Sequence, residues 1–149
     1  MVEEVGKHYA FIVGNDHGVV EAKKMVDFFK STLAYDDVKS LEDATDQEII
    51  AKIREYRFLK KEDTLFFYYC GHGQVVKDQF HFATKQTLLP NSFLLIELSQ
   101  IPSYSQLLFI DADYSGAFKT TSSNGKIVMC SAGESAKAIQ ESNFSRFFI

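Results

Sequence analysis

Two apolar runs of this chain each end in a short polar segment: Asp63-Thr-Leu-Phe-Phe-Tyr-Tyr-Cys-Gly-His-Gly73 and Gln106-Leu-Leu-Phe-Ile-Asp-Ala-Asp-Tyr-Ser-Gly116. Near-continuous apolar runs of this length are typical of strands that are buried on both faces of a parallel sheet. In such sheets, ligands bind in the crevice beyond the carboxyl ends of the strands. We therefore expect His72, Asp111 and Asp113 to lie at that edge.

The rest of the chain alternates between strand and helix patterns. Further strands are predicted at Lys7–Val13 and Lys126–Ser131, with a shorter, more polar one at Asp36–Leu41. Gln74–Thr84 reads as a hairpin that turns at Lys77-Asp78. This alternation predicts a three-layer α/β/α fold, in which a mostly parallel sheet of five core strands carries helices on both faces.

Three helices are predicted from apolar side chains at helical spacing. The first buries Ala22, Met25, Val26, Phe29 and Leu33. The second begins with a capping box of Thr45 and Glu48 and buries Ile49, Ile53 and Tyr56. The third, capped by Asn91 or Ser92 and ended by Pro102, buries Leu94, Leu98 and Ile101. A flexible loop is predicted at Lys119–Gly125, and the start of another helix is predicted at Phe144–Ile149.

Length and charge exclude several classes of protein. The chain has 149 residues, of which 46% are hydrophobic, so residues 1–149 are expected to form one domain. A net charge of −4 indicates no nucleic-acid partner, and no apolar stretch is long enough for a membrane span. Cys70 and Cys130 both end apolar runs and are expected to be reduced core thiols, which fits a cytoplasmic or nuclear location.

The two polar segments together resemble the caspase-like cysteine peptidases (peptidase family C14), in particular the metacaspases and their bacterial relatives. That family carries Tyr-Ser-Gly-His-Gly after one strand and Asp-x-Cys-x-Ser-Gly after a later one. This chain has Tyr-Cys-Gly-His-Gly at 69–73 and Asp-Ala-Asp-Tyr-Ser-Gly at 111–116. The similarity extends to Phe11–Asn15 and Val19–Met25 and covers nearly the whole chain. It implies a single caspase-like domain over residues 1–149 that lacks the final strand and helix of the family.

The resemblance implies that His72 is the general base and that the Gly73 N–H is part of the oxyanion hole. Asp113 stands where the family has its nucleophilic cysteine. A carboxylate is a weak acyl nucleophile, and it favours the charged form of a neighbouring imidazole, which cannot act as a general base. We therefore expect an inactive pseudo-peptidase that acts by binding a protein or peptide partner, or by regulating an active relative.

The resemblance also implies a substrate pocket for arginine or lysine. Asp111 matches one acidic residue of that pocket, Glu21 takes the place of a second, and Cys70 stands where the family has serine. For Glu21, the alternative is a solvent-facing carboxylate in the first turn of a helix. The aspartates that bind calcium in many metacaspases are not recognisable around residues 131–138, where Glu134 is the only acid. No cofactor and no metal site is predicted.

Other interpretations remain open at this point. The chain could be an active endopeptidase that cleaves after arginine or lysine, in which the nucleophile has been substituted. The segment Phe109–Ser115 also resembles the Asp-x-Asp-x-Thr signature of haloacid-dehalogenase-type phosphatases, with Asp111 as nucleophile and Asp113 as acid/base. Against that reading, the motif comes late in the chain and leaves the Gly-His-Gly segment unexplained. A structural alternative is that Asp111 and Asp113 lie on a loop and have no catalytic role.

The partner is expected to bind along a sheet edge. Without the family's sixth strand, the Lys126–Ser131 strand would be an unpaired edge, and such an edge invites pairing with another chain. A homologous caspase-like chain is therefore one expected partner. The alternative is that residues 1–149 are a piece of a longer protein.

Overall fold

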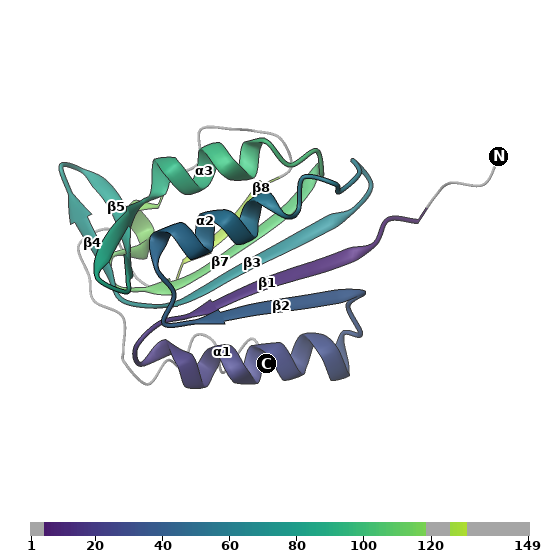
Figure 1. The fold of residues 1–149 in the computed structure, drawn as a ribbon, viewed down its shortest axis with the longest axis horizontal. Coiled ribbons are helices and arrows are strands. Elements are labelled where there is room, and N and C mark those ends of the chain that lie inside the picture. Colours follow the sequence, from purple (N-terminus) through teal and green to yellow (C-terminus); the bar gives the residue numbers. More distant parts are fainter. Residues whose placement is uncertain (1–4, 119–125, 131–149) are drawn as a thin grey trace.

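The computed structural model describes residues 5–118 and the backbone of residues 126–130. The central sheet is parallel and has the strand order β2-β1-β3-β7-β8 (Figure 1). Its strands are β1 (His8–Gly14), β2 (Asp37–Glu42), β3 (Thr64–Gly71), β7 (Ser105–Ala112) and β8 (Lys126–Cys130). The mixed α/β class with a parallel sheet, predicted from the sequence, is confirmed.

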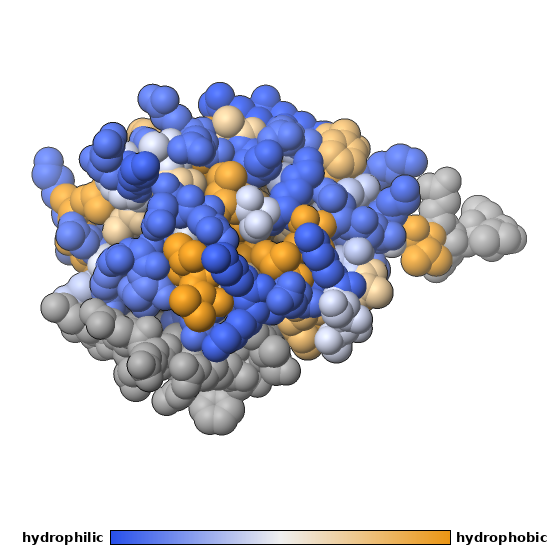
Figure 2. All heavy atoms as spheres, turned by 60° about the horizontal axis from the view of Figure 1, so that its bottom comes forward, coloured by the Kyte–Doolittle hydropathy of each residue, from blue (hydrophilic) through white to orange (hydrophobic). Residues whose placement is uncertain are grey.

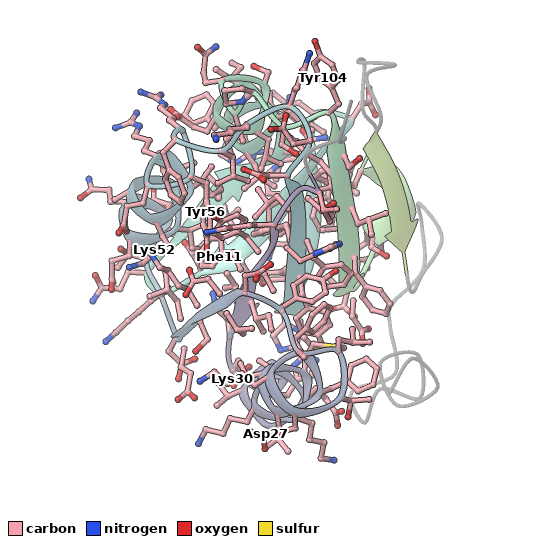
Figure 3. The ribbon with its side chains drawn as sticks, turned by 90° about the vertical axis from the view of Figure 1, so that its right-hand side faces the viewer. Phe11, Asp27, Lys30, Lys52, Tyr56 and Tyr104 are labelled. Carbon is pink, nitrogen blue, oxygen red and sulfur yellow. The ribbon has the colours of Figure 1, made fainter. Side chains whose placement is uncertain are left out.

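Helices cover the two faces of this sheet. Helix α1 (Gly18–Asp27) lies on one face, and α2 (Asp46–Arg54) and α3 (Asn91–Ser99) lie on the other (Figure 1). Neighbouring residues of a strand point to opposite faces, so β1 contributes Ile12 to the core under α1 and Phe11 to the core under α2. In Figure 3, Phe11 lies beside Tyr56, and their ring centroids are 6.1 Å apart.

The first helix departs from its predicted pattern at its end. Ala22, Met25 and Phe29 are buried as expected, but Leu33 is 42% exposed, so its predicted place on the apolar face is wrong. After α1 the chain forms a π-helical turn, Phe28–Thr32, in which the Leu33 N–H donates to the carbonyl of Phe28, five residues earlier. The wider turn rotates Leu33 away from the sheet.

The second helix matches its prediction. Thr45 and Glu48 form the reciprocal capping box, with the Glu48 N–H donating to Thr45 Oγ1 over 3.1 Å. The predicted inner face of Ile49, Ile53 and Tyr56 is buried.

The third helix buries Leu94, Leu98 and Ile101 as predicted, but its start differs. Its N-cap is Pro90, and neither Asn91 nor Ser92 caps it. The reason is that a strand not expected from the sequence, β6 (Thr87–Pro90), runs directly into the helix. The predicted hairpin is present as β4 (Gly73–Val76) and β5 (Gln79–Thr84), and β6 extends it to a three-stranded antiparallel sheet.

Two sequence predictions, the loop at Lys119–Gly125 and the helix start at Phe144–Ile149, fall outside the described residues. Within residues 5–118 and 126–130, no helix has the length and apolar character needed to cross a membrane. The face of the molecule seen in Figure 2 is mostly hydrophilic, with small groups of apolar side chains between charged ones.

The strand order places a topological switch point between β1 and β3. The chain runs from β1 outward to β2 on one side, and later through β3, β7 and β8 on the other. This order corresponds to 2-1-3-4-5 among the sheet's own strands, for which ligands bind at the carboxyl ends of the first and third strands. The site is therefore to be sought after Gly14 and Gly71.

The packing of α1 against the end of β3 predicts a large effect of Gly18→Ala. A Cβ at residue 18 would lie 1.9 Å from the carbonyl oxygen of Cys70, so helix or strand has to move. We expect a loss of about 3 kcal/mol in the free energy of unfolding, because overpacking against backbone is not easily relieved. Urea denaturation measures this loss. Val20→Ala, at a 60% exposed position of the same helix, is the control and should stay within about 0.5 kcal/mol of wild type.

Candidate active site

Polar residues follow three neighbouring strands at one edge of the sheet. Asp16 and His17 follow β1, His72 follows β3, and Asp113 follows β7. The parallel register pairs Gly14 with Cys70, and Cys70 with Asp111, so the three strands end side by side. The carboxyl ends of the strands therefore bring these side chains together.

His72 contacts a carboxylate with each of its ring nitrogens. Its Nδ1 lies 3.0 Å from Asp113 Oδ2, and its Nε2 lies 3.0 Å from Asp16 Oδ2. The predicted meeting of His72 with Asp113 is confirmed. Since carboxylate oxygens only accept hydrogen bonds, both contacts are hydrogen bonds only when both ring nitrogens carry a proton.

A second histidine completes this group. His17 Nδ1 lies 3.3 Å from His72 Nε2, and the two ring centroids are 4.5 Å apart at an interplanar angle of 62°. The sequence analysis missed Asp16 and His17. The signal was available, because Asn15-Asp16-His17 is a polar segment that follows an apolar strand, just as Gly-His-Gly does.

Tyr69 hydrogen-bonds to the backbone of His72. The Tyr69 hydroxyl lies 2.7 Å from the carbonyl oxygens of both His72 and Ala83, which share its single O–H as donor. The Ala83 N–H donates to the His72 carbonyl over 3.0 Å. Burial raises the pKa of Tyr69 well above its usual range, so the hydroxyl remains a donor. These bonds tie the end of β3 to the hairpin strand β5.

Asn15 ties β1 to the same point. Its Nδ2 donates to the carbonyl of Ala83 over 3.1 Å, and its Oδ1 accepts from the Ala44 N–H over 3.1 Å. Its own backbone N–H donates to the Cys70 carbonyl over 2.9 Å. One buried amide thus links the ends of β1 and β3 to β5 and to the segment before α2.

Gly73 allows the turn after β7 to approach closely. A Cβ at residue 73 would lie 2.4 Å from the carbonyl oxygen of Asp113 and 2.5 Å from the ring of Phe80. The next residue of that turn, Tyr114, has a φ of 58°, which is uncommon for a side chain of this size. The absence of a side chain at Gly73 therefore positions Asp113 beside His72.

The predicted substrate-binding residues lie on the α1 side of the sheet. Glu21, Asp111 and Cys70 are all buried, and Glu21 is only 5% exposed, so the alternative of a solvent-facing carboxylate is wrong. Burial, and next the charge of Asp111, raise the pKa of Cys70 to about 12, with a smaller effect of Glu21. Cys70 is therefore a protonated core thiol at neutral pH, and the expectation of a reduced core thiol is met.

A cleft of about 380 Å³ opens beside His72. Its lining consists of Asn15, Asp16, Asp43, His72 and residues 83–85. Asp43 accepts a hydrogen bond from the Asp16 N–H over 2.7 Å and so fixes the turn after β1, where Asp16 has a φ of 53°. Lys85 is the basic residue of this lining.

Comparison with known proteins agrees with this geometry. Residues 7–143 match the sequence model of the caspase domain, peptidase family C14. No curated protein matches the sequence. The match gives no support to the haloacid-dehalogenase alternative. A match over this share of the chain, together with the histidine at the carboxyl end of a central parallel strand, shows that the chain belongs to the caspase domain family of peptidase family C14.

Proposed function

We propose that this chain is a caspase-like domain without peptidase activity, and that its three-layer scaffold of five core strands acts through protein binding. The observation that supports this most directly is the pair of carboxylates on the ring nitrogens of His72. A general base needs an unprotonated nitrogen aimed at the group it deprotonates. In this arrangement Asp113 occupies one nitrogen and Asp16 the other.

The residue at the nucleophile position also supports a lack of peptidase activity. In the resemblance described above, Asp113 corresponds to the cysteine, and here its carboxylate lies 3.0 Å from the histidine. A thiolate attacks a peptide carbonyl because sulfur is intrinsically nucleophilic, whereas a carboxylate is a weak acyl nucleophile. Loss of the nucleophile in comparable triads leaves only about a 10³–10⁴-fold effect over water.

Glu21 and Asp111, the two acids that the family resemblance assigns to a substrate pocket, support a partner with a basic side chain. Glu21 and Asp111 both act on Cys70 electrostatically, which means that the two carboxylates lie near one thiol on the same side of the sheet. Two acids in such a position favour an arginine or lysine of a bound protein or peptide. The proposed partner is therefore a protein segment with a basic residue, or an active relative of this chain.

Peptidase assays test the proposed inactivity. We expect the purified protein to release no more fluorophore than a blank from peptides with arginine, lysine or aspartate before the scissile bond, because a carboxylate and not a thiolate lies at His72 Nδ1. The measurement is initial rate against enzyme concentration, with and without iodoacetamide. A rate that grows with protein and disappears after alkylation would refute the proposal.

Asp113→Cys tests whether the rest of the site is intact. The introduced thiol would replace the carboxylate on His72 Nδ1, while Asp16 still accepts from Nε2 and orients the ring, as the third member of a triad does. We expect this thiol to be alkylated by iodoacetamide at pH 7 at least 10-fold faster than any thiol of the wild-type protein, and peptides with arginine or lysine to be cleaved.

The matched control is the double variant Asp113→Cys, His72→Gln, which should lose both the fast alkylation and the cleavage. Slow alkylation of the single variant would contradict the role of His72. Fast alkylation without cleavage would mean that Gly73, Glu21 and Asp111 do not bind a substrate productively.

The edge strand β8 is a proposed contact for a second caspase-like chain. Among the strands that the structure describes, β8 is paired with β7 alone and stands at the end of the sheet order. Its free backbone groups could pair with a strand of a partner. A homologous chain, or a second copy, offers such a strand.

Sedimentation velocity tests this pairing. We expect a concentration-dependent dimer that persists in the double variant Phe93→Glu, Ile96→Glu, because these exposed apolar residues lie on α3 and not at β8. A strictly monomeric protein at high concentration would contradict the proposal. A dimer that the double variant abolishes would assign the contact to α3.

A further inference from the structure

We propose that Asp16, His17 and His72 form a binding site for one divalent transition-metal ion of the zinc class. Each residue offers one ligand atom, and these atoms all lie within 4.8 Å of one another. No metal site was predicted from the sequence, and this proposal departs from that expectation. It does not depend on the proposed lack of peptidase activity, and the two can fail separately.

The distances suit a small ion. Zinc bonds to histidine nitrogen and carboxylate oxygen are about 2.0–2.2 Å long, so tetrahedral neighbours lie roughly 3.3 Å apart. His17 Nδ1 and His72 Nε2 are 3.3 Å apart, and His72 Nε2 and Asp16 Oδ2 are 3.0 Å apart. The third separation, between the Asp16 carboxylate and His17 Nδ1, can shorten by rotation of the Asp16 side chain, which is 76% exposed.

The donor set selects the kind of metal. Two imidazole nitrogens and one carboxylate suit zinc, cobalt, nickel, copper or iron, whereas calcium and magnesium prefer oxygen ligands throughout. Three protein ligands leave a further position open, which is the pattern of zinc sites that bind a water or a small ligand. Asp16 and His72 line the cleft described above, so that position is accessible from solvent.

An independent observation concerns the other nitrogen of His72. Metal-binding histidines almost always donate their second ring N–H to a carboxylate or carbonyl, which fixes the ring and the tautomer. Asp113 Oδ2 lies 3.0 Å from His72 Nδ1 and supplies this acceptor. A metal ion on Nε2 would replace a proton there, and Asp113 would keep its hydrogen bond. The residue that replaces the family's cysteine is thus suited to orient a metal ligand.

The surrounding backbone holds the ligands before any metal binds. Tyr69 and Asn15 fix the end of β3, as described above, and Asp43 fixes the turn that carries Asp16. Asp16 and His17 come from the turn after β1, and His72 comes from the end of β3. A bound ion would therefore bridge two strands at the switch point, and it would stabilise the folded state because the unfolded chain lacks the assembled site.

Direct binding to the full chain tests the proposal. After removal of metals with a chelator, isothermal titration with Zn²⁺ should give one ion per chain, and Tm should rise with Zn²⁺. Asp16→Asn, His17→Gln and His72→Gln should each weaken binding at least 10-fold, and asparagine at residue 16 tolerates the positive φ. Asp113→Ala should weaken binding about 10-fold or more, because it removes the acceptor for His72 Nδ1.

The matched controls are His8→Gln and His81→Gln, which remove the other two histidines of the chain and should leave the affinity unchanged. Co²⁺ in place of Zn²⁺ should give visible absorption without a sulfur-to-cobalt charge-transfer band, since no cysteine is a ligand. No binding, equal losses in the two controls, or a charge-transfer band would each overturn the assignment. Apo-protein Tm values of the variants show that each is folded.

Discussion

The parallel pairing of β1, β3 and β7 is the constraint on which the site depends. Because the register aligns Gly14, Cys70 and Asp111, the polar turns that follow these strands emerge at one edge and within contact distance. A slip of one residue would send His72 to the opposite face from its partners. The helices stabilise this register from both sides, since each face of β1 and β3 is filled by aromatic and aliphatic side chains.

Buried polar groups next to the site hold the aligned strand ends in a fixed geometry. Asn15 and Tyr69 together satisfy carbonyl groups of three segments, and neither points into solvent. Buried polar groups that are fully paired rigidify their surroundings, because breaking one bond leaves another group unsatisfied. Gly73 adds the complementary constraint: it leaves space for the Asp113 carbonyl. His72 is thus held by its backbone as well as by its ring.

Two carboxylates and a second imidazole surround the ring of His72. Asp113 contacts Nδ1 of His72 and Asp16 contacts Nε2, so each ring nitrogen has a carboxylate partner. The adjoining His17 adds a second imidazole nitrogen, 3.3 Å from His72 Nε2. The two proposals use neighbouring residues but rest on different ones: the lack of peptidase activity depends on Asp113, and the metal site depends on Asp16, His17 and His72.

The sequence by itself determined the mixed α/β class, the buried strands and the meeting of His72 with Asp113, because apolar runs and strand-end motifs are local signals. Only the tertiary structure decided that Asp16 and His17 join them, since contacts between residues some 55 positions apart depend on strand order and register. It also decided that Glu21 is buried and that Leu33 is exposed, because helix packing and a π-turn override periodicity. Likewise, β6 displaced the expected cap of α3, since strand pairing with β5 fixes the backbone up to Pro90.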